Sequence, residues 1–312
     1  MLMELFSFYN VENLFLPDPE PRHKLDPTIS GLRNWNERKY KNKLYKIAHV
    51  FQLIKEENGT LPFIIGLSEV SGKQVLEDLI RMQPFNSEYG IVHYNSRDER
   101  KVDVAMLYDK NKVEIIDSEA ITFFFENENK NIENYDTTRD VLYSVLKYKE
   151  EIINVFIAHL PSKREKDINR PKRIFILNEI QRRILDLINA DENVILCGDF
   201  NENPDDENLV KILYDNSYEK VLENPFQQLF STGNYSTFHY KSGLLFDQIL
   251  LSESFFKEDN MLSFQNAGIF KPGKISCRDK NFEGRPFRTY AGTRYLGGYS
   301  DHFPVYVSLG KV

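Results

Sequence analysis

Short apolar segments alternate with amphipathic segments along this chain of 312 residues. From Glu37 to Glu57, apolar residues recur at spacings of three and four, which predicts a helix with one buried face. Phe63 to Leu67 is a continuous apolar run that follows Pro62, as is typical of a buried strand. A chain that interleaves both signals must cover its sheets with helices, so we expect a mixed α/β fold.

The same two patterns extend to the end of the chain. We expect further helices at Val75–Met82, Pro171–Ile188 and Pro204–Tyr214. We expect further strands at Leu5–Tyr9, Val102–Tyr108, Val113–Phe125, Val141–Tyr148, Ile152–Ala158, Asn193–Cys197, Phe246–Leu250 and Phe303–Leu309. Glu126 to Asn134 is polar and is expected to form a surface loop. No repeat or flexible linker divides the chain, which predicts a single domain over residues 1–312.

Charge is unevenly distributed. The net charge of −7 does not fit the overall basic surface of a protein that binds duplex nucleic acid. Two local clusters are nevertheless basic, Lys163 to Arg173 and Lys271 to Arg294. These clusters are either solvated loops or a rim that attracts anions, and the sequence leaves both interpretations open.

The sequence indicates a cytoplasmic protein without a membrane span. No apolar run approaches the roughly 20 residues that a spanning helix needs. The first residues lack the basic start and long apolar stretch of an export signal, although a leader trimmed from a longer precursor remains compatible with them. Cys197 and Cys277 are far apart, which disfavours a disulfide framework or a zinc–cysteine site. The oligomeric state is not fixed by the sequence, and a monomer is plausible.

Polar residues with catalytic chemistry stand at the ends of several expected strands. Asp199 and Asn201 follow the strand that ends at Cys197, and in extended backbone both side chains would face one ligand. Asp301 and His302 immediately precede the last strand. Four more polar residues stand at strand ends: Asn10, Glu69, His159 and Asp247. Each position alone has a structural explanation, but together they predict one site at an edge of the sheets.

The ordered set of motifs resembles the endonuclease/exonuclease/phosphatase superfamily. The matching elements are NVENLF from Asn10, GLSEV around Glu69, AHLPSK around His159, GDFNENP around Asp199, FDQILLS around Asp247 and YSDHFPV around Asp301. The opening FYNVENLF and the segment after Trp35 are most similar to bacterial members whose substrates the sequence does not define. The resemblance implies a four-layered α/β sandwich, in which two packed mixed β-sheets are flanked by helices.

The resemblance also implies a divalent metal ion. Glu69 is the expected ligand, with Asn10 and Asp301 contributing directly or through water. Magnesium prefers such oxygen ligands, and manganese is the alternative. A chain with six histidines and no histidine-rich cluster fits zinc less well.

The remaining roles describe hydrolysis of a phosphate ester. Asp199 would orient and deprotonate the attacking water, and Asn201 would donate a hydrogen bond to the phosphate or to that water. His159 and a protonated His302 would bind the phosphate oxygens, with Asp247 holding the imidazole of His302. Arg139 would contact the phosphate, or else be a surface cation at a strand start.

The substrate remains open at this stage. A nucleic-acid phosphodiester would be held by the two basic clusters, with Phe282, Phe287, Tyr290 or Tyr295 stacking on bases. A small phosphorylated metabolite or a lipid head group is the alternative. A binding module without catalysis is the third hypothesis, and it should lack an essential acid, amide or histidine. None of those residue types is missing from the expected positions.

Overall fold

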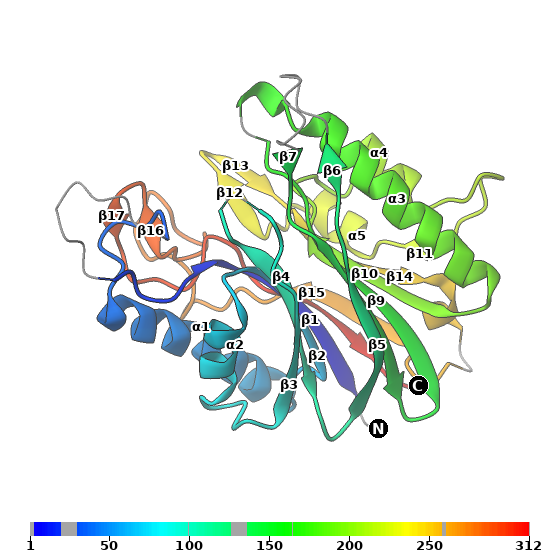
Figure 1. The fold of residues 1–312 in the computed structure, drawn as a ribbon, viewed down its shortest axis with the longest axis horizontal. Helices are drawn as coiled ribbons and strands as arrows, with labels where there is room; N and C mark the ends of the chain where they lie inside the picture. Colours follow the sequence, from blue (N-terminus) through cyan, green and yellow to red (C-terminus); the bar gives the residue numbers. More distant parts are fainter. Residues whose placement is uncertain are drawn as a thin grey trace.

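The computed structural model describes residues 3–19, 30–98, 100–125, 136–163, 165–257 and 260–311. Within these ranges, two six-stranded sheets pack face to face and helices cover both outer faces (Figure 1). The four-layered α/β sandwich is therefore confirmed. The expected surface loop at Glu126–Asn134 lies outside the described residues.

The first sheet contains both ends of the described chain. Its strand order is β15 (Phe264–Ile269), β18 (Val305–Leu309), β1 (Glu4–Leu14), β2 (Ile64–Val70), β4 (Asp103–Asp109) and β3 (Tyr89–His93). β1 runs parallel to β2 and antiparallel to β18. The carboxyl ends of β1 and β2 consequently meet the start of β18 at one edge of the sheet.

The second sheet repeats this arrangement. Its strand order is β11 (Leu222–Glu223), β14 (Asp247–Ser252), β10 (Asn193–Asp199), β9 (Glu151–His159), β8 (Val141–Tyr148) and β5 (Val113–Ile121). β9 and β10 are parallel, and their last residues, His159 and Asp199, are paired. Asp199 is also paired with Asp247, the first residue of the antiparallel strand β14. Three predicted site residues are thus adjacent because of strand register alone.

The alternation of side chains along β1 shows how the layers are held together. Phe6 and Phe8 are fully buried between the two sheets, whereas Leu5 and Tyr9 face the helices on the other side. Helices α1 (Glu37–Asn58) and α2 (Lys73–Ile80) cover this first sheet, and α3 (Arg170–Asn189) and α4 (Glu207–Lys211) cover the second. None of the described helices combines the length and apolar character needed to cross a membrane.

Several expected elements have different bounds in the structure. The strand predicted at Val113–Phe125 ends at Ile121, and Phe124–Phe125 forms the separate short strand β6, paired with β7 (Asp136–Thr137). The helix predicted at Pro204–Tyr214 is reduced to the five residues of α4. Elements that the sequence patterns did not predict include β3, β15, β11, α5 (Phe226–Ser231) and the hairpins β12–β13 (Thr237–His239, Ser242–Leu244) and β16–β17 (Tyr290–Ala291, Arg294–Tyr295).

Gly66 lies where the two sheets approach each other, and it provides a test of this packing. A Cβ atom there would be 2.9 Å from Cδ2 of Phe8 and 3.2 Å from Sγ of Cys197. We expect Gly66→Ala to lower the free energy of unfolding by about 1–3 kcal/mol, because overpacking displaces both neighbours. Denaturant unfolding measures this. Gly273→Ala is the control, because a Cβ there meets no described atom within 4 Å. Equal stability of the two variants would contradict the predicted packing.

Candidate active site

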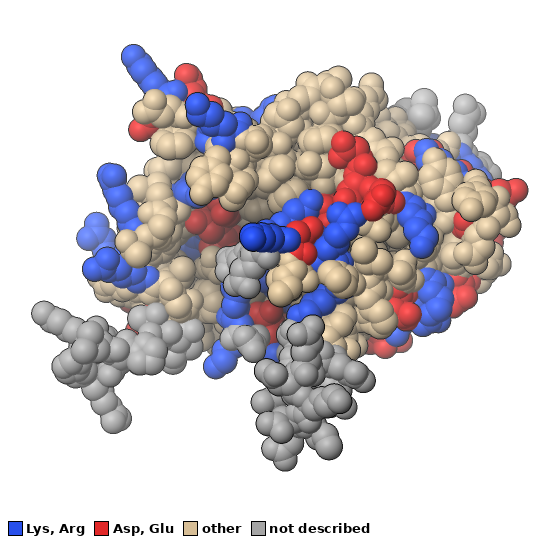
Figure 2. Space-filling model, turned by 90° about the horizontal axis from the view of Figure 1, so that it is seen from above, with Lys and Arg blue, Asp and Glu red and all other residues tan. Residues whose placement is uncertain are grey.

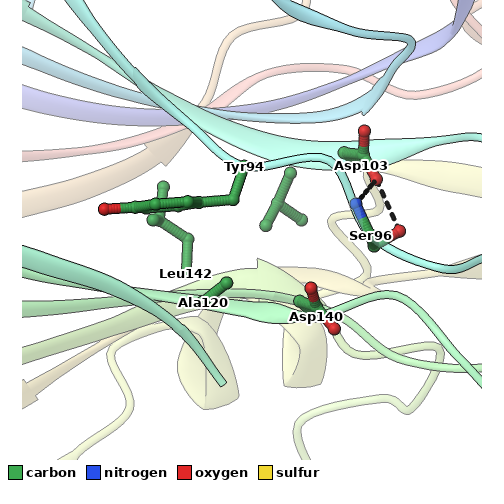
Figure 3. Close-up of a pocket in the computed structure, with 7 residues that line it drawn as sticks. Tyr94, Ser96, Asp103, Ala120, Asp140 and Leu142 are labelled. Atoms are coloured by element: carbon green, nitrogen blue, oxygen red, sulfur yellow. Dashed lines mark hydrogen bonds between the residues drawn. The ribbon is translucent and has the colours of Figure 1, made fainter. Parts of the chain in front are cut away.

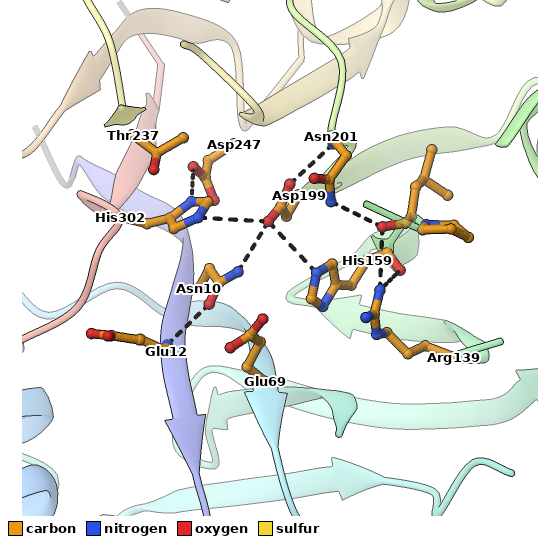
Figure 4. Close-up of polar contacts among 12 residues, drawn as sticks. Asn10, Glu12, Glu69, Arg139, His159, Asp199, Asn201, Thr237, Asp247 and His302 are labelled. Carbon is orange, nitrogen blue, oxygen red and sulfur yellow. Dashed lines mark hydrogen bonds and ion pairs between the residues drawn. The ribbon is translucent and has the colours of Figure 1, made fainter. Parts of the chain in front are cut away.

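Asp199 lies at the centre of a buried polar cluster that joins the two sheets (Figure 4). Its Oδ2 atom accepts a hydrogen bond of 3.0 Å from Nδ2 of Asn10, which belongs to the first sheet. The same oxygen is 3.6 Å from Nε2 of His159 and 3.9 Å from Nε2 of His302. Residues that are up to 292 positions apart in the sequence therefore meet within hydrogen-bonding or ion-pairing range, as the sequence predicted.

The two histidines beside Asp199 differ in protonation. Burial lowers the pKa of His159 well below its ordinary value, and the charges of Arg139 and Arg100 lower it further. Burial also disfavours the charged form of His302, but Asp247, Asp199 and Asp301 raise the pKa of His302 well above its ordinary value. The site thus presents a neutral imidazole on one side of Asp199 and an imidazolium on the other.

Asp247 accounts for the charge and orientation of His302. Oδ2 of Asp247 is 2.7 Å from Nδ1 of His302, and Asp247 itself is fully buried at the start of β14. The hydroxyl of Ser236 donates a 2.6 Å hydrogen bond to the same carboxylate oxygen. This places Asp247 where the resemblance implied. Ser236 belongs to none of the sequence motifs and was not predicted as part of the site.

Asp199 has an environment suited to exchanging a proton near neutral pH. Burial raises the pKa of Asp199 to about 6, and the charge of Asp247 adds to this rise. His302 and the hydrogen bonds from Asn10 and the backbone of Asn201 act in the opposite direction. A carboxylate with a pKa close to the ambient pH can accept a proton and release it again.

Asn201 differs from the sequence prediction in its backbone. It does not continue the extended strand, because β10 ends at Asp199 and Asn201 has a left-handed φ of 50°. The backbone N–H of Asn201 donates to Oδ1 of Asp199 at 3.0 Å, and its side-chain Nδ2 donates to the carbonyl of Leu160 at 2.9 Å. The expectation that both side chains point the same way along a strand was wrong. Asn201 instead holds the turn that fixes Asp199.

Glu69 is presented by an irregularity in β2. The pairing of β2 with β4 shifts register between Ser68 and Val70, and Glu69 has a φ of 63°. Bulges of this kind redirect a side chain out of the regular alternation. Oε2 of Glu69 accepts a 3.0 Å hydrogen bond from the backbone of Asn13, and Oε1 is 3.7 Å from Nη2 of Arg100. The neighbouring strand β1 is irregular as well, because its pairing with β2 shifts register between Asn10 and Leu14.

Three carboxylates at this edge, Glu12, Asp301 and Glu69, act on the charge of one buried lysine. Burial and the charge of Asp301 raise the pKa of Glu12 to about 7. Lys43 is fully buried, and burial lowers its pKa to about 8 although Glu12, Asp301 and Glu69 all act to raise it. Lys43 and Arg100, which lies beside Glu69, partly compensate the charges of these three carboxylates. Their oxygens, with Oδ1 of Asn10, are the donor type that a hard divalent cation prefers, so these residues fit the implied metal.

A second possible metal cluster consists of Asp199, Asp247 and His302. One ligand atom from each residue lies within 4.8 Å of the others, so these residues could hold a metal ion. However, Nδ1 of His302 is already bonded to Asp247, and a protonated imidazole has no free lone pair for a metal. Metal binding there would require His302 to lose its proton.

Arg139 lies beneath His159 and is only 7% exposed. Its Nη1 donates to the carbonyls of His159 and Leu160 at 3.4 and 3.3 Å, and its Nε is 3.7 Å from Asp98. The interpretation of Arg139 as a surface cation was therefore wrong. In this structure the guanidinium supports the segment that carries His159, and its charge acts on both Glu69 and Asp199.

Three members of the basic cluster from Lys163 to Arg173 pair with carboxylates within the protein. Arg173 is buried, and its Nε and Nη2 bond to Glu202 at 2.8 and 2.7 Å. Lys163 pairs with the same carboxylate, and Arg170 pairs with Glu207. Neither interpretation of the cluster, a solvated loop or an anion-attracting rim, applies to Arg173, because Arg173 is buried and its charge serves to hold the segments after β9 and β10.

A small cavity lies elsewhere between the sheets, and two aspartates line it (Figure 3). The backbone and hydroxyl of Ser96 donate to Oδ1 of Asp103 at 2.9 and 2.5 Å. Oδ1 of Asp140 has no hydrogen-bond partner among the described residues. The volume of about 10 Å³ corresponds to the space for one water molecule, which would satisfy this oxygen.

The fold and the site together define a class of protein: an α/β sandwich with an Asn–Asp–His cluster at one edge of its paired sheets. Comparison with known sequences identifies the family to which this class corresponds. The chain belongs to the endonuclease/exonuclease/phosphatase family, whose sequence profile matches residues 5–311. A search of curated protein sequences gives no match.

Solved structures with the same fold are similar over nearly the entire chain. D. rerio TDP2 in complex with a single-stranded DNA product shows 16% identity and a TM-score of 0.60, covering 99% of each chain. The mannosyl-6-phosphatase of Bacteroides thetaiotaomicron shows 16% identity and a TM-score of 0.60, covering 98% of this chain and 99% of the other. An endonuclease/exonuclease/phosphatase from Bacteroides vulgatus shows 17% identity and a TM-score of 0.58, covering 100% of both. At these identities the similarity establishes the fold.

Proposed function

We propose that this protein is a magnesium-dependent phosphoesterase that cleaves a phosphate ester by in-line attack of water, and that it acts as a nuclease-type phosphodiesterase. The central observation is the buried Asp199, held by Asn10 between a neutral and a protonated histidine. Family membership supports hydrolysis of a phosphate ester. A non-catalytic binding module is disfavoured because the acids, the amide and both histidines are present and meet in space.

In this mechanism, Asp199 accepts the proton of the attacking water, and Asn10 keeps the carboxylate in position through its amide. The imidazolium of His302 donates to a non-bridging phosphate oxygen and stabilises the charge that develops there. Asp247 maintains that proton on His302. The neutral His159 donates one ring N–H to the phosphate without repelling the other cations.

A divalent cation would be held by Glu69, together with Asn10 and Asp301. When bound, it supplies Lewis-acid stabilisation of the phosphate and of the leaving oxygen. Magnesium suits the oxygen donors, and manganese shares this preference. Arg100, 3.7 Å from Glu69, would limit the mobility of that carboxylate when the cation is absent.

The substrate is tested directly with purified protein and magnesium. The panel contains single-stranded DNA, RNA, nucleotides, mannose 6-phosphate, phosphoinositides, sphingomyelin and the chromogenic diester bis(4-nitrophenyl) phosphate. We expect hydrolysis of at least one diester, its loss with a chelator, and recovery with added magnesium. The likeness to a mannosyl-6-phosphatase keeps a small phosphorylated metabolite as the alternative. A steep fall in affinity with salt favours nucleic acid, because each phosphate contact releases counterions. Inactivity on every ester, with magnesium or manganese, would contradict the proposal.

The assignment of Glu69 gives a separate prediction. We expect Glu69→Gln to raise the magnesium concentration for half-maximal activity by at least about tenfold, because a ligand loses its charge. Activity measured against magnesium concentration tests this, with Glu77→Gln on the outer helix α2 as the matched control. An unchanged magnesium requirement would remove Glu69 from the metal site.

A further inference from the structure

A groove with a volume of about 510 Å³ opens beside the proposed active site. It is bordered by the hairpin β12–β13 on one side and by the segment from Ser276 to Leu296 on the other. Its most prominent side chains are aromatic rings and guanidinium groups: Phe238, Tyr240, Phe282, Phe287, Arg285 and Arg288. This volume is in the range of sites for small organic ligands.

The groove adjoins the residues that would bind the phosphate in the proposed reaction. Asp301 lines the groove, and the next residue is His302. Thr237, which precedes Phe238 of the groove wall, donates a 2.8 Å hydrogen bond to the carbonyl of Asp301. A substrate with its phosphate at His302 would therefore extend the adjoining part of the molecule into the groove.

The opposite wall is anchored to the rest of the protein. Nζ of the buried Lys43 donates to Oγ1 of Thr289 and to the carbonyl of Tyr299, both at 2.6 Å. Glu12 accepts the backbone N–H groups of Thr289 and Tyr290 at 2.6 and 3.2 Å. The groove is thus built on the same strand, β1, that carries Asn10.

The chemistry of the walls selects for a planar and anionic ligand. The guanidinium of Arg285 lies 5.3 Å from the ring of Phe238 and 5.2 Å from the ring of Phe282, an arrangement that aligns flat groups. Arg288 adds a second positive charge. Among the described residues that line the groove, Asp301 is the one carboxylate, and no asparagine or glutamine takes part. A sugar would need several such polar partners, whereas a base needs ring faces and its phosphate needs cations.

The distribution of charged side chains around the groove is consistent with an anionic ligand. Figure 2 shows the face that carries the active-site edge: Lys and Arg side chains lie on the left, the side of the β16–β17 hairpin, and across the middle, and acidic side chains lie in a hollow and to the right of it. Tyr290 and Tyr295, considered from the sequence for stacking on bases, instead pack against each other and α1. The hydroxyl of Tyr290 donates to the carbonyl of Arg33, and the hydroxyl of Tyr295 accepts from Nδ2 of Asn42.

We infer that this groove binds a nucleobase together with its neighbouring phosphate, so that the substrate is a nucleic-acid strand or a nucleotide with a second phosphate. The inference rests on the proposed phosphoesterase function. In this inference Phe238, Phe282, Arg285 and Arg288 determine which class of substrate binds. None of these residues takes part in the reaction itself.

Cys277 provides a test that does not depend on turnover. It is a partly exposed residue of the groove, while Cys197, the other cysteine of the chain, is fully buried. We measure the rate of iodoacetamide alkylation of the unmodified protein in the presence of a chelator. A short single-stranded oligothymidylate and thymidine 3′,5′-bisphosphate are the probes, and mannose 6-phosphate and inorganic phosphate are the comparisons. Cys277→Ser identifies the labelled thiol.

We expect at least about fivefold slower alkylation with the nucleotide probes and no slowing with mannose 6-phosphate at the same concentration. Protection by the oligothymidylate alone identifies a strand, and protection by both probes identifies a single nucleotide unit. No protection by either overturns the inference, even if bis(4-nitrophenyl) phosphate is hydrolysed. Protection without hydrolysis of any ester overturns the proposed function instead.

Variants give a second readout. We expect Phe282→Ala and Arg285→Ala each to raise the KM for oligothymidylate by about tenfold, because stacking and a phosphate contact are lost. Phe256→Ala is the matched control, since Phe256 is also an exposed phenylalanine but packs against Phe264 away from the groove. Equal KM values for Phe282→Ala and Phe256→Ala would overturn the inference.

Discussion

Asp199→Asn should lower the kcat of phosphate-ester hydrolysis by about a thousandfold or more while the protein stays folded. The amide has nearly the same shape as the carboxylate, but its single oxygen can accept from Asn10 or from the backbone of Asn201 and not from both, so one of the two hydrogen bonds is lost. It cannot accept a proton from water. It also removes one of the negative charges that keep His302 protonated, although Asp247 still contacts that ring at 2.7 Å.

Two measurements separate loss of chemistry from loss of structure. Thermal unfolding followed by circular dichroism should show a folded variant, and single-turnover kinetics should show the defect in the chemical step. Asp103→Asn is the matched control, because Asp103 is also a buried aspartate at a strand end but lies at the small cavity between the sheets. A kcat within a few-fold of the unmodified protein for Asp199→Asn would disprove the role of this residue.

The mixed α/β fold and the site were predictable from local signals repeated along the chain, whereas the four-layer order was implied by the family resemblance. The apolar run before Asp199 reveals its strand, and the same holds for Asn10, Glu69 and His159, although in the structure β1 continues past Asn10 to Leu14 and β2 continues to Val70. Since parallel strands end at one edge, these residues had to meet once both sheets formed. Register completed the arrangement by pairing Asp199 with both His159 and Asp247.

The sequence did not reveal features that arise from backbone turns and from long-range burial. The left-handed φ of Glu69 has no signature in residue type, whereas asparagine, the residue at position 201, is enriched in this region of φ. Lys43 and Arg173 look like ordinary basic positions of amphipathic helices. Both are buried because a carboxylate from a distant segment, Glu12 or Glu202, reaches them. Only Glu12 had a possible signal, as it lies in the same motif as Asn10.

The groove shows the same limit for substrate recognition. A cluster of basic residues between Lys271 and Arg294 was visible, but its geometry was not. Of the four aromatic residues that the sequence offered for base stacking, Phe282 and Phe287 line the groove. Tyr290 and Tyr295 instead pack against each other in the wall opposite the β12–β13 hairpin. The sequence around these residues does not distinguish the two phenylalanines from the two tyrosines. All four lie in irregular or two-stranded segments, and the direction of these segments depends on contacts with α1 and β12.

Arg173→Met should lower the free energy of unfolding by about 3–5 kcal/mol, because it leaves a buried carboxylate without its main partner. Arg173 and Glu202 are 1% and 2% exposed, and the guanidinium also donates to the carbonyl of Pro161 at 3.1 Å and to Asp167 at 2.6 Å. Denaturant unfolding of the whole chain measures the effect. Arg182→Met on the same helix is the control, because Arg182 is 60% exposed and its pairs with Glu179 and Asp186 contribute at most about 1 kcal/mol.

The Arg173–Glu202 pair also connects stability to catalysis. Pro161 lies two residues after His159, and Glu202 directly follows Asn201, so the guanidinium holds both segments in place behind the reacting groups. We therefore expect the Arg173→Met variant to lose activity at temperatures where it is still folded. The double variant Arg173→Met/Glu202→Leu should recover part of the lost stability, since the unpaired charge is gone, but not the activity. If Arg173→Met cost less than about 1 kcal/mol, the pair would behave like a surface ion pair, and its assignment as the brace of the site would be wrong.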